Sequence, residues 1–168
     1  MEVVVNDTNI FIDLYTIGML DEFFNLPINV HTVDFVINEI TNHKQLDAIN
    51  NYIENNKLMV HSFNAQELID VIELHNSVSG NLSVTDCAVW YCAQRNNYTL
   101  LTGDRQLRDR ASESKVLVKG IIYIFDLLVE HNLITANLAS EKIQELMMYN
   151  PRLPKSIIKE RIETWEKI

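Results

Sequence analysis

Carboxylates stand at points of this sequence where apolar strand-like runs end. Asp7 follows the run EVVVN, and Asp104 comes shortly after the run TLL. Parallel strands present their carboxyl ends at one edge of a sheet, where the ligands of α/β proteins collect, so we expect these two side chains to meet. Asp86, near the start of an apolar helix, is the third candidate. Three carboxylates at one edge repel one another, and a hard cation bound by oxygen ligands is the usual remedy.

Each of these carboxylates also has a purely structural interpretation. Ser83 and Asp86 have the spacing of a helix capping box, which the helix dipole favours. Asp7 in DTN is typical of an Asx turn, and Asp104 in TGDR is typical of a turn after a strand. The residue types alone leave both interpretations open at all three positions.

The kind of metal follows from which ligands the sequence offers. Its five histidines show no HxxxH or similar pairing, and Cys87 and Cys92 lie five positions apart in one predicted helix. That cysteine spacing fits neither a zinc ligand pair nor a disulfide, so we expect both thiols to be reduced core residues. Mg²⁺ or Mn²⁺ therefore suits the carboxylates better than zinc.

The elements that must position these residues alternate between strand and helix patterns. Apolar runs predict strands at 2–6, 28–31, 57–63, 98–104 and 115–118, and apolar periodicity predicts helices at 9–15, 33–40, 44–55, 64–77, 82–95, 120–131, 135–149 and 155–167. Thr32 is expected to cap the helix that follows it. Strands alternating with helices predict an α/β fold whose parallel sheet is covered on both faces.

Length and composition indicate one folded domain. The chain has 168 residues, 47% of them hydrophobic, with only 4 Gly and 3 Pro. The longest apolar run, 121–129, is too short for a bilayer and is interrupted by Asp126. The start MEVVVND resembles no signal peptide, so we expect a cytoplasmic protein with no membrane association.

The net charge of −9 argues against binding a polyanion over a wide surface. Bound cations would offset part of the acidic excess. The stretch 95–119 carries six basic residues against three acidic ones, a local excess of +3. Within it, Arg105 and Arg108 follow Asp104 by one and four positions and could bind RNA phosphates bidentately, although solvated surface charge explains them equally well.

Four segments together resemble the acidic motifs of PIN-domain nucleases, particularly VapC-like toxins of type II toxin–antitoxin pairs. These segments are VVVNDTNIFIDL, VINEI, LSVTDCAVWYCA and LLTGDRQLR, in the family's order and spacing. The resemblance covers roughly residues 2–130 and implies a three-layer PIN-like fold with a central parallel sheet flanked by helices. It divides the chain into a nuclease domain, 1–135, and a C-terminal helical extension, 136–168, packed on the same domain.

Carried over residue by residue, the resemblance assigns the family's acidic site to this chain. Its four acidic residues become Asp7, Glu39, Asp86 and Asp104, which would be both catalytic and metal-binding. The assignment of Glu39 to the site depends chiefly on this resemblance. The polar residues that orient the acidic ones become Thr8, Asn9 and Thr102.

The resemblance implies hydrolysis of RNA phosphodiester bonds with Mg²⁺ or Mn²⁺. It also implies a cognate antitoxin protein and a possible homodimer. Two alternatives stay open: a PIN-like module that binds RNA or protein without cutting, and a metal-dependent phosphatase on another α/β fold. The sequence NDTN lacks the DxD pair expected of haloacid-dehalogenase-type phosphatases.

Overall fold

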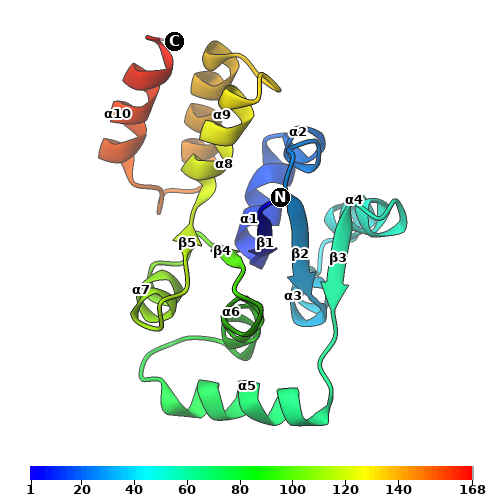
Figure 1. Cartoon of the computed structure of the whole chain (residues 1–168). Coiled ribbons are helices and arrows are strands. Elements are labelled where there is room, and N and C mark those ends of the chain that lie inside the picture. The colour runs from blue at the N-terminus through cyan, green and yellow to red at the C-terminus, as the bar shows by residue number, and fades with distance from the viewer. Residues whose placement is uncertain (168) are drawn as a thin grey trace.

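A five-stranded parallel sheet forms the centre of the protein (Figure 1). The computed structural model describes residues 1–167. The strands are β1 (Val3–Asn6), β2 (Asn29–Val33), β3 (Leu58–His61), β4 (Thr99–Leu101) and β5 (Val118–Lys119), in the order β3-β2-β1-β4-β5. Because β1 is the middle strand, its end is flanked by the ends of β2 and β4, which brings Asp7 beside segments far away in the sequence.

Helices cover both faces of this sheet. They are α1 (Thr8–Thr16), α2 (Leu20–Phe24), α3 (Asp34–Glu39), α4 (His43–Glu54), α5 (Ala65–Ser77), α6 (Val84–Asn96), α7 (Arg105–Glu113), α8 (Ile121–Glu130), α9 (Ala136–Tyr149) and α10 (Lys155–Trp165). The helix α6 packs on β1, β2 and β4, and nearly all of its middle residues are buried. The predicted α/β class, with a central parallel sheet flanked by helices, is confirmed.

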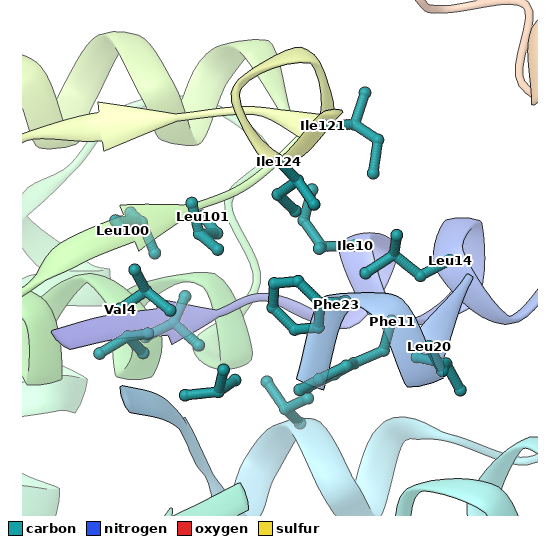
Figure 2. Packing of buried hydrophobic residues seen from close by; sticks show 14 of the residues in the cluster. Val4, Ile10, Phe11, Leu14, Leu20, Phe23, Leu100, Leu101, Ile121 and Ile124 are labelled. Atoms are coloured by element: carbon teal, nitrogen blue, oxygen red, sulfur yellow. The ribbon is translucent and has the colours of Figure 1, made fainter. Parts of the chain in front are cut away.

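The core explains why the central strands read as apolar runs rather than as alternating patterns. Val4 and Val5 are fully buried although they point to opposite faces of the sheet. Figure 2 shows the Val4 side of the core, where side chains from α1, α2 and α8 gather, among them Ile10, Phe23 and Ile124. The sheet is thus enclosed from both sides, and its functional surface must lie at an edge.

Local predictions differ from the structure at four places, one being the strand expected at 115–118, which lies at Val118–Lys119. Thr32 lies inside β2, and its hydroxyl donates to the carbonyl oxygen of Asn6 at 2.8 Å, so the prediction that it caps a helix is wrong. The strand continues because Val33 pairs with His61 of β3. The short helix α2 and the polar helix α7 were not predicted, because neither shows a long apolar repeat.

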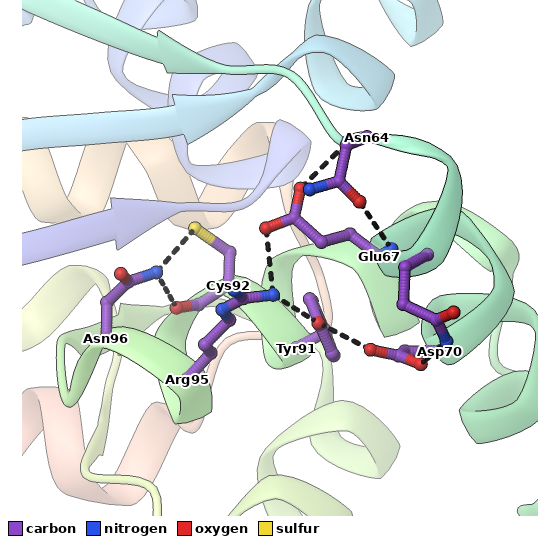
Figure 3. A network of polar contacts seen from close by, with 8 residues as sticks. Asn64, Glu67, Asp70, Tyr91, Cys92, Arg95 and Asn96 are labelled. Atoms are coloured by element: carbon purple, nitrogen blue, oxygen red, sulfur yellow. Dashed lines mark hydrogen bonds and ion pairs between the residues drawn. The ribbon is translucent and has the colours of Figure 1, made fainter.

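A polar network fastens α5 to α6 (Figure 3). Arg95 of α6 forms an ion pair with Glu67 at 2.8 Å and donates to the Tyr91 hydroxyl at 2.8 Å. That hydroxyl donates in turn to Asp70 of α5 at 2.9 Å. Glu67 also completes a capping box with Asn64, so the start of α5 is tied to the end of α6.

The last three helices form one packed unit. Trp165 of α10 is 2% exposed, lies 5.9 Å from the Phe125 ring of α8, and donates through Nε1 to Asp126 at 2.9 Å. Asn150, which follows α9, donates to Asp13 of α1 at 3.0 Å. The division of the chain at residue 135 stays a prediction, and residue 168 of the predicted extension lies outside the described residues.

Two further expectations concern the thiols and the membrane. Cys87 and Cys92 are free and buried, as predicted, and burial raises the pKa of each thiol to about 11. In the part of the chain that the structure describes, no helix has the length and apolar character that crossing a bilayer requires.

Two histidines that show no relation in the sequence lie in contact on neighbouring strands. His31 Nδ1 and His61 Nε2 are 2.8 Å apart, and the Tyr98 ring lies edge-on to His31 at 5.2 Å. One of the two facing nitrogens must accept the hydrogen bond, so the pair cannot carry protons on both. Burial, and then the neighbouring His61, lower the pKa of His31.

We expect acid to destabilise this contact. Because folding lowers the pKa of His31, the unfolded chain takes up a proton more readily than the folded protein does. The folded state is therefore fully stable above the ordinary histidine pKa of 6.5, and it loses stability as the pH falls below that value. In His61→Gln the amide can still donate to His31, but the neighbouring imidazole is gone. Between pH 7.5 and 5.5, wild type should therefore lose more stability than His61→Gln in urea unfolding. The exposed His43→Gln serves as control, and parallel pH profiles for wild type and His61→Gln would contradict this explanation.

Candidate active site

Asp7 is a buried carboxylate at the carboxyl end of the central strand. It is 2% exposed and lies between β1 and α1, where its backbone N–H donates to the carbonyl oxygen of Leu101 at 3.0 Å. Its Oδ1 accepts from the backbone N–H of Thr8 at 2.7 Å, so the carboxylate caps α1. Its Oδ2 accepts from Asn9 Nδ2 and from the Thr102 hydroxyl, each at 2.7 Å.

The protonation of Asp7 is shifted far from that of an exposed aspartate. Burial raises its pKa from 3.8 to about 6, against the opposing effect of the hydrogen bond from Thr102. The negative charge of Asp86 raises the pKa further, the bond from Thr8 lowers it, and Glu39 raises it. Three carboxylates are thus close enough to influence one another, as repulsion at a shared site requires.

The polar residues expected to orient the site join β1 to β4. Asn9 donates to Asp7 and accepts from the backbone N–H of Gly103 at 2.9 Å. The Thr102 hydroxyl donates to Asp7 and accepts from the backbone N–H of Asp104 at 3.1 Å. One network therefore fixes the ends of both strands and links two of the predicted acidic residues.

Glu39 lies at the end of α3, on the exposed side of that helix. Its Oε2 accepts from the Thr8 hydroxyl at 2.5 Å, which turns the side chain toward Asp7. Its charge raises the pKa of both Asp7 and Asp86. The structure therefore places this residue, whose position in the sequence was uninformative, beside the other carboxylates.

Asp86 has the capping role that its sequence allows. The Ser83 N–H donates to Asp86 Oδ2 at 2.7 Å, and the Asp86 N–H donates to the Ser83 hydroxyl at 3.0 Å. Burial raises the pKa of Asp86, the bonds from Ser83 lower it, and the charges of Asp104 and Glu39 raise it. Asp86 is thus both a helix cap and a member of the acidic group.

Asp104 caps α7 through Oδ1, which accepts from the backbone N–H of Leu107 at 2.7 Å. Three of the four acidic residues, Asp7, Asp86 and Asp104, therefore have a helix-capping role in the structure. Capping engages one oxygen each of Asp104 and Asp86, and the hydrogen bonds among residues 1–167 leave the second oxygen of each free. Structural and metal-binding roles can coexist at these positions.

The donor set fits a hard divalent cation in kind. All four acidic side chains offer oxygen ligands, and their mutual repulsion would be relieved by a cation. Within residues 1–167, however, no three of the His, Cys, Asp and Glu side chains are close enough to hold one ion together. Hydrated Mg²⁺, which keeps several of its waters, suits such an open arrangement better than an ion needing a complete protein cage.

The two arginines beside Asp104 differ in their surroundings. Arg105 has a side chain 94% exposed, with Asp109 at 3.9 Å. Arg108 is half-buried and donates to the Thr102 carbonyl oxygen at 3.0 Å, close to Gly120. The sequence did not indicate this structural contact of Arg108, and phosphate binding by both arginines stays a prediction.

Comparison with known proteins gives one match that spans the chain. The PIN domain family DUF3368 matches residues 3–167. No curated protein matches.

Among solved structures, a PilT N-terminus domain protein from the archaeon Sulfolobus solfataricus P2 is 16% identical, with a TM-score of 0.47 over 76% of this chain and 92% of that one. VapBC2 from Rickettsia felis, bound to a fragment of its promoter DNA, is 16% identical, with a TM-score of 0.45 over 70% of this chain and 98% of that one. FitAcB from Neisseria gonorrhoeae is 12% identical, with a TM-score of 0.42 over 68% and 95%.

Proposed function

The chain belongs to the PIN domain family DUF3368, and from this premise we propose that it is a metal-dependent endoribonuclease. The observation that carries the proposal is the coupling of buried Asp7 to Asp86 and Glu39. Their charges raise its pKa, and a network of strand-end hydrogen bonds holds it in place. A buried carboxylate whose pKa is raised by burial and by neighbouring carboxylates is typical of a functional site.

We assign roles to the acidic residues as follows. Asp7, Asp86 and Asp104 would hold one or two Mg²⁺ or Mn²⁺ ions directly or through water, and Glu39 would bind the ion or orient a water. When bound, the metal would lower the pKa of a water and stabilise the charge that develops on the phosphate. Thr8, Asn9 and Thr102 hold the carboxylates of Asp7 and Glu39 in position. Cleavage would leave 5′-phosphate and 3′-hydroxyl ends.

RNA is the proposed substrate despite the acidic net charge. The stretch 95–119 includes α7, which begins at Arg105 directly after its cap Asp104, so basic side chains start one residue from the proposed metal site. Arg105 is exposed there and free to approach a phosphate. The basic side chains would then attract RNA to the proposed site alone, and not to the whole surface of the protein.

We further propose that the protein is the toxin of a toxin–antitoxin pair, which rests on the resemblance of its four motifs to VapC-like toxins. An antitoxin of the usual kind would lay a helix or an extended segment over the acidic site. A homodimer and a cytoplasmic location belong to the same proposal.

Metal-dependent cleavage is the direct test. Wild-type protein should cut structured RNA with Mn²⁺ and lose this activity in EDTA, because the carboxylates alone cannot supply the nucleophile and the Lewis acid. Gel analysis of labelled RNA would show the cleavage, and calorimetry would show Mn²⁺ binding. Binding of RNA without cleavage or Mn²⁺ binding would favour a non-catalytic PIN module. Turnover of a small phosphomonoester without RNA cleavage would favour a phosphatase.

A further inference from the structure

The loop 78–82, which joins α5 to α6, lies against α7, and its glycine Gly80 sits where a side chain would displace Gln106. Gly80 has a φ of +120°, which side-chain-bearing residues rarely adopt. A Cβ at this position would lie 1.6 Å from Gln106 Nε2 and 2.8 Å from Gln106 Cδ. The side-chain amide of Gln106 is therefore packed directly on the backbone of the loop.

Hydrogen bonds hold the same loop to the same face of α7. Gln106 Oε1 accepts from the backbone N–H of Asn81 at 3.2 Å. Arg110, one helical turn further along α7, donates to the Ser79 hydroxyl at 3.0 Å. The loop is thus attached at two points, and α7 itself is anchored in the core by fully buried Leu107.

This attachment joins the starts of the two helices that carry Asp86 and Asp104. The loop leads directly into Ser83, which caps α6 and bonds reciprocally with Asp86. Gln106 lies two residues after Asp104, the cap of α7. The contacts of the loop with Gln106 and Arg110 therefore link the segment that caps α6 to the first half of α7.

We propose that Gln106 is a positioning residue that fixes Asp86 and Asp104 at the separation needed to hold a divalent cation between them. The inference rests on the proposed metal-dependent function. Gln106 acts through the loop and Ser83 and touches neither carboxylate in this role. Gly80 leaves room for this contact, because any side chain at position 80 would displace the Gln106 amide.

The test compares Gln106→Ala, Gly80→Ala and the conservative Gln106→Glu, which keeps an acceptor for the Asn81 N–H. Gln94→Ala, an exposed glutamine on α6, is the control. Substitution of a residue that orients a metal ligand typically lowers the metal affinity 10- to 100-fold. Gln106→Ala should therefore weaken Mn²⁺ binding about 10-fold by calorimetry and lower kcat for RNA with KM nearly unchanged. Gly80→Ala should act in the same direction, Gln106→Glu should recover part of the loss, and Gln94→Ala should match wild type.

Circular dichroism establishes that each variant is folded at the assay temperature. The inference is overturned if folded Gln106→Ala binds Mn²⁺ and cleaves RNA within twofold of wild type. It is also overturned if kcat and Mn²⁺ affinity fall no further than in the control. A wild-type protein that neither binds Mn²⁺ nor cleaves RNA would overturn the proposed function as well, so the two failures are distinguishable.

Discussion

Asp7→Asn is expected to abolish metal-dependent RNA cleavage and, at the same time, to stabilise the metal-free protein at pH 7.5. Loss of a metal ligand removes several kcal/mol of transition-state stabilisation, and each 1.36 kcal/mol is tenfold in rate, so cleavage should fall by at least about 100-fold. Labelled RNA assays with Mn²⁺ measure this loss. Opposite effects on activity and stability are typical of a group kept for function rather than for folding.

The gain in stability follows from the protonation of Asp7. Burial and neighbouring carboxylates raise its pKa from 3.8 to about 6, so the ionised form is disfavoured in the folded state. Keeping this 2% exposed side chain ionised above pH 6 costs the folded protein about 3 kcal/mol. An asparagine could still accept from Asn9 and Thr102, but it would lose the bond from the Thr8 N–H, at about 1 kcal/mol. The net gain is about 2 kcal/mol, or roughly 4–8 °C in Tm.

The pH dependence of this gain provides the control. The cost of ionisation is absent below pH 3.8 and grows as the pH rises toward 6, so the advantage of Asp7→Asn should shrink as the pH is lowered from 7.5 to 4. Urea unfolding in EDTA, followed by circular dichroism, measures it. Asp109→Asn, an exposed carboxylate on α7, should match wild type in stability and cleavage. Added Mn²⁺ should stabilise wild type but not Asp7→Asn. A metal-free Asp7→Asn less stable than wild type at pH 7.5 would contradict the explanation.

Trp165→Ala is expected to destabilise the protein by about 3–5 kcal/mol, as truncation of a buried aromatic side chain usually does. Trp165 is 2% exposed, packs near Phe125 and donates to Asp126 at 2.9 Å. Its removal would leave a cavity between α8 and α10 and would take one partner from the Asp126 carboxylate, leaving its ion pair with Arg161 at 3.5 Å; burial raises the pKa of Asp126, and the Trp165 bond and Arg161 lower it. Urea unfolding followed by circular dichroism measures the loss.

Two variants show which part of this contact matters. Trp165→Phe keeps most of the apolar contact and loses the hydrogen bond, so we expect a loss of about 1–2 kcal/mol. Lys159→Ala, at an exposed position on the same helix, should change stability by less than about 0.5 kcal/mol. A loss below 1 kcal/mol for Trp165→Ala would mean that α10 is not part of the cooperative core. In that case the helix would be free for docking to a partner.

The positions of the proposed site residues were predictable where a single short segment contains the pattern. Asp7 and Asp104 follow buried strands, and the ends of such strands share an edge in a parallel sheet, so the sequence predicted both residues at that edge. The structure links them through the Thr102 hydroxyl, which donates to Asp7 and accepts from the Asp104 N–H. Asp86 was predictable with its capping role, which it has. Glu39 was not: it is exposed on α3, and only the bond from Thr8 turns its side chain toward the site.

The sequence by itself determined the fold class, the strands that Asp7 and Asp104 follow, and the free, buried state of the two cysteines. These depend on apolar runs, helical periodicity and spacing, which are local properties of the chain. The tertiary structure alone decided that Thr32 belongs to a strand, that His31 meets His61, and that Gln106 holds the loop at Gly80. Each of these contacts joins segments 25 or more residues apart. Strand order and helix packing fix such contacts, and no pattern within a single segment encodes them.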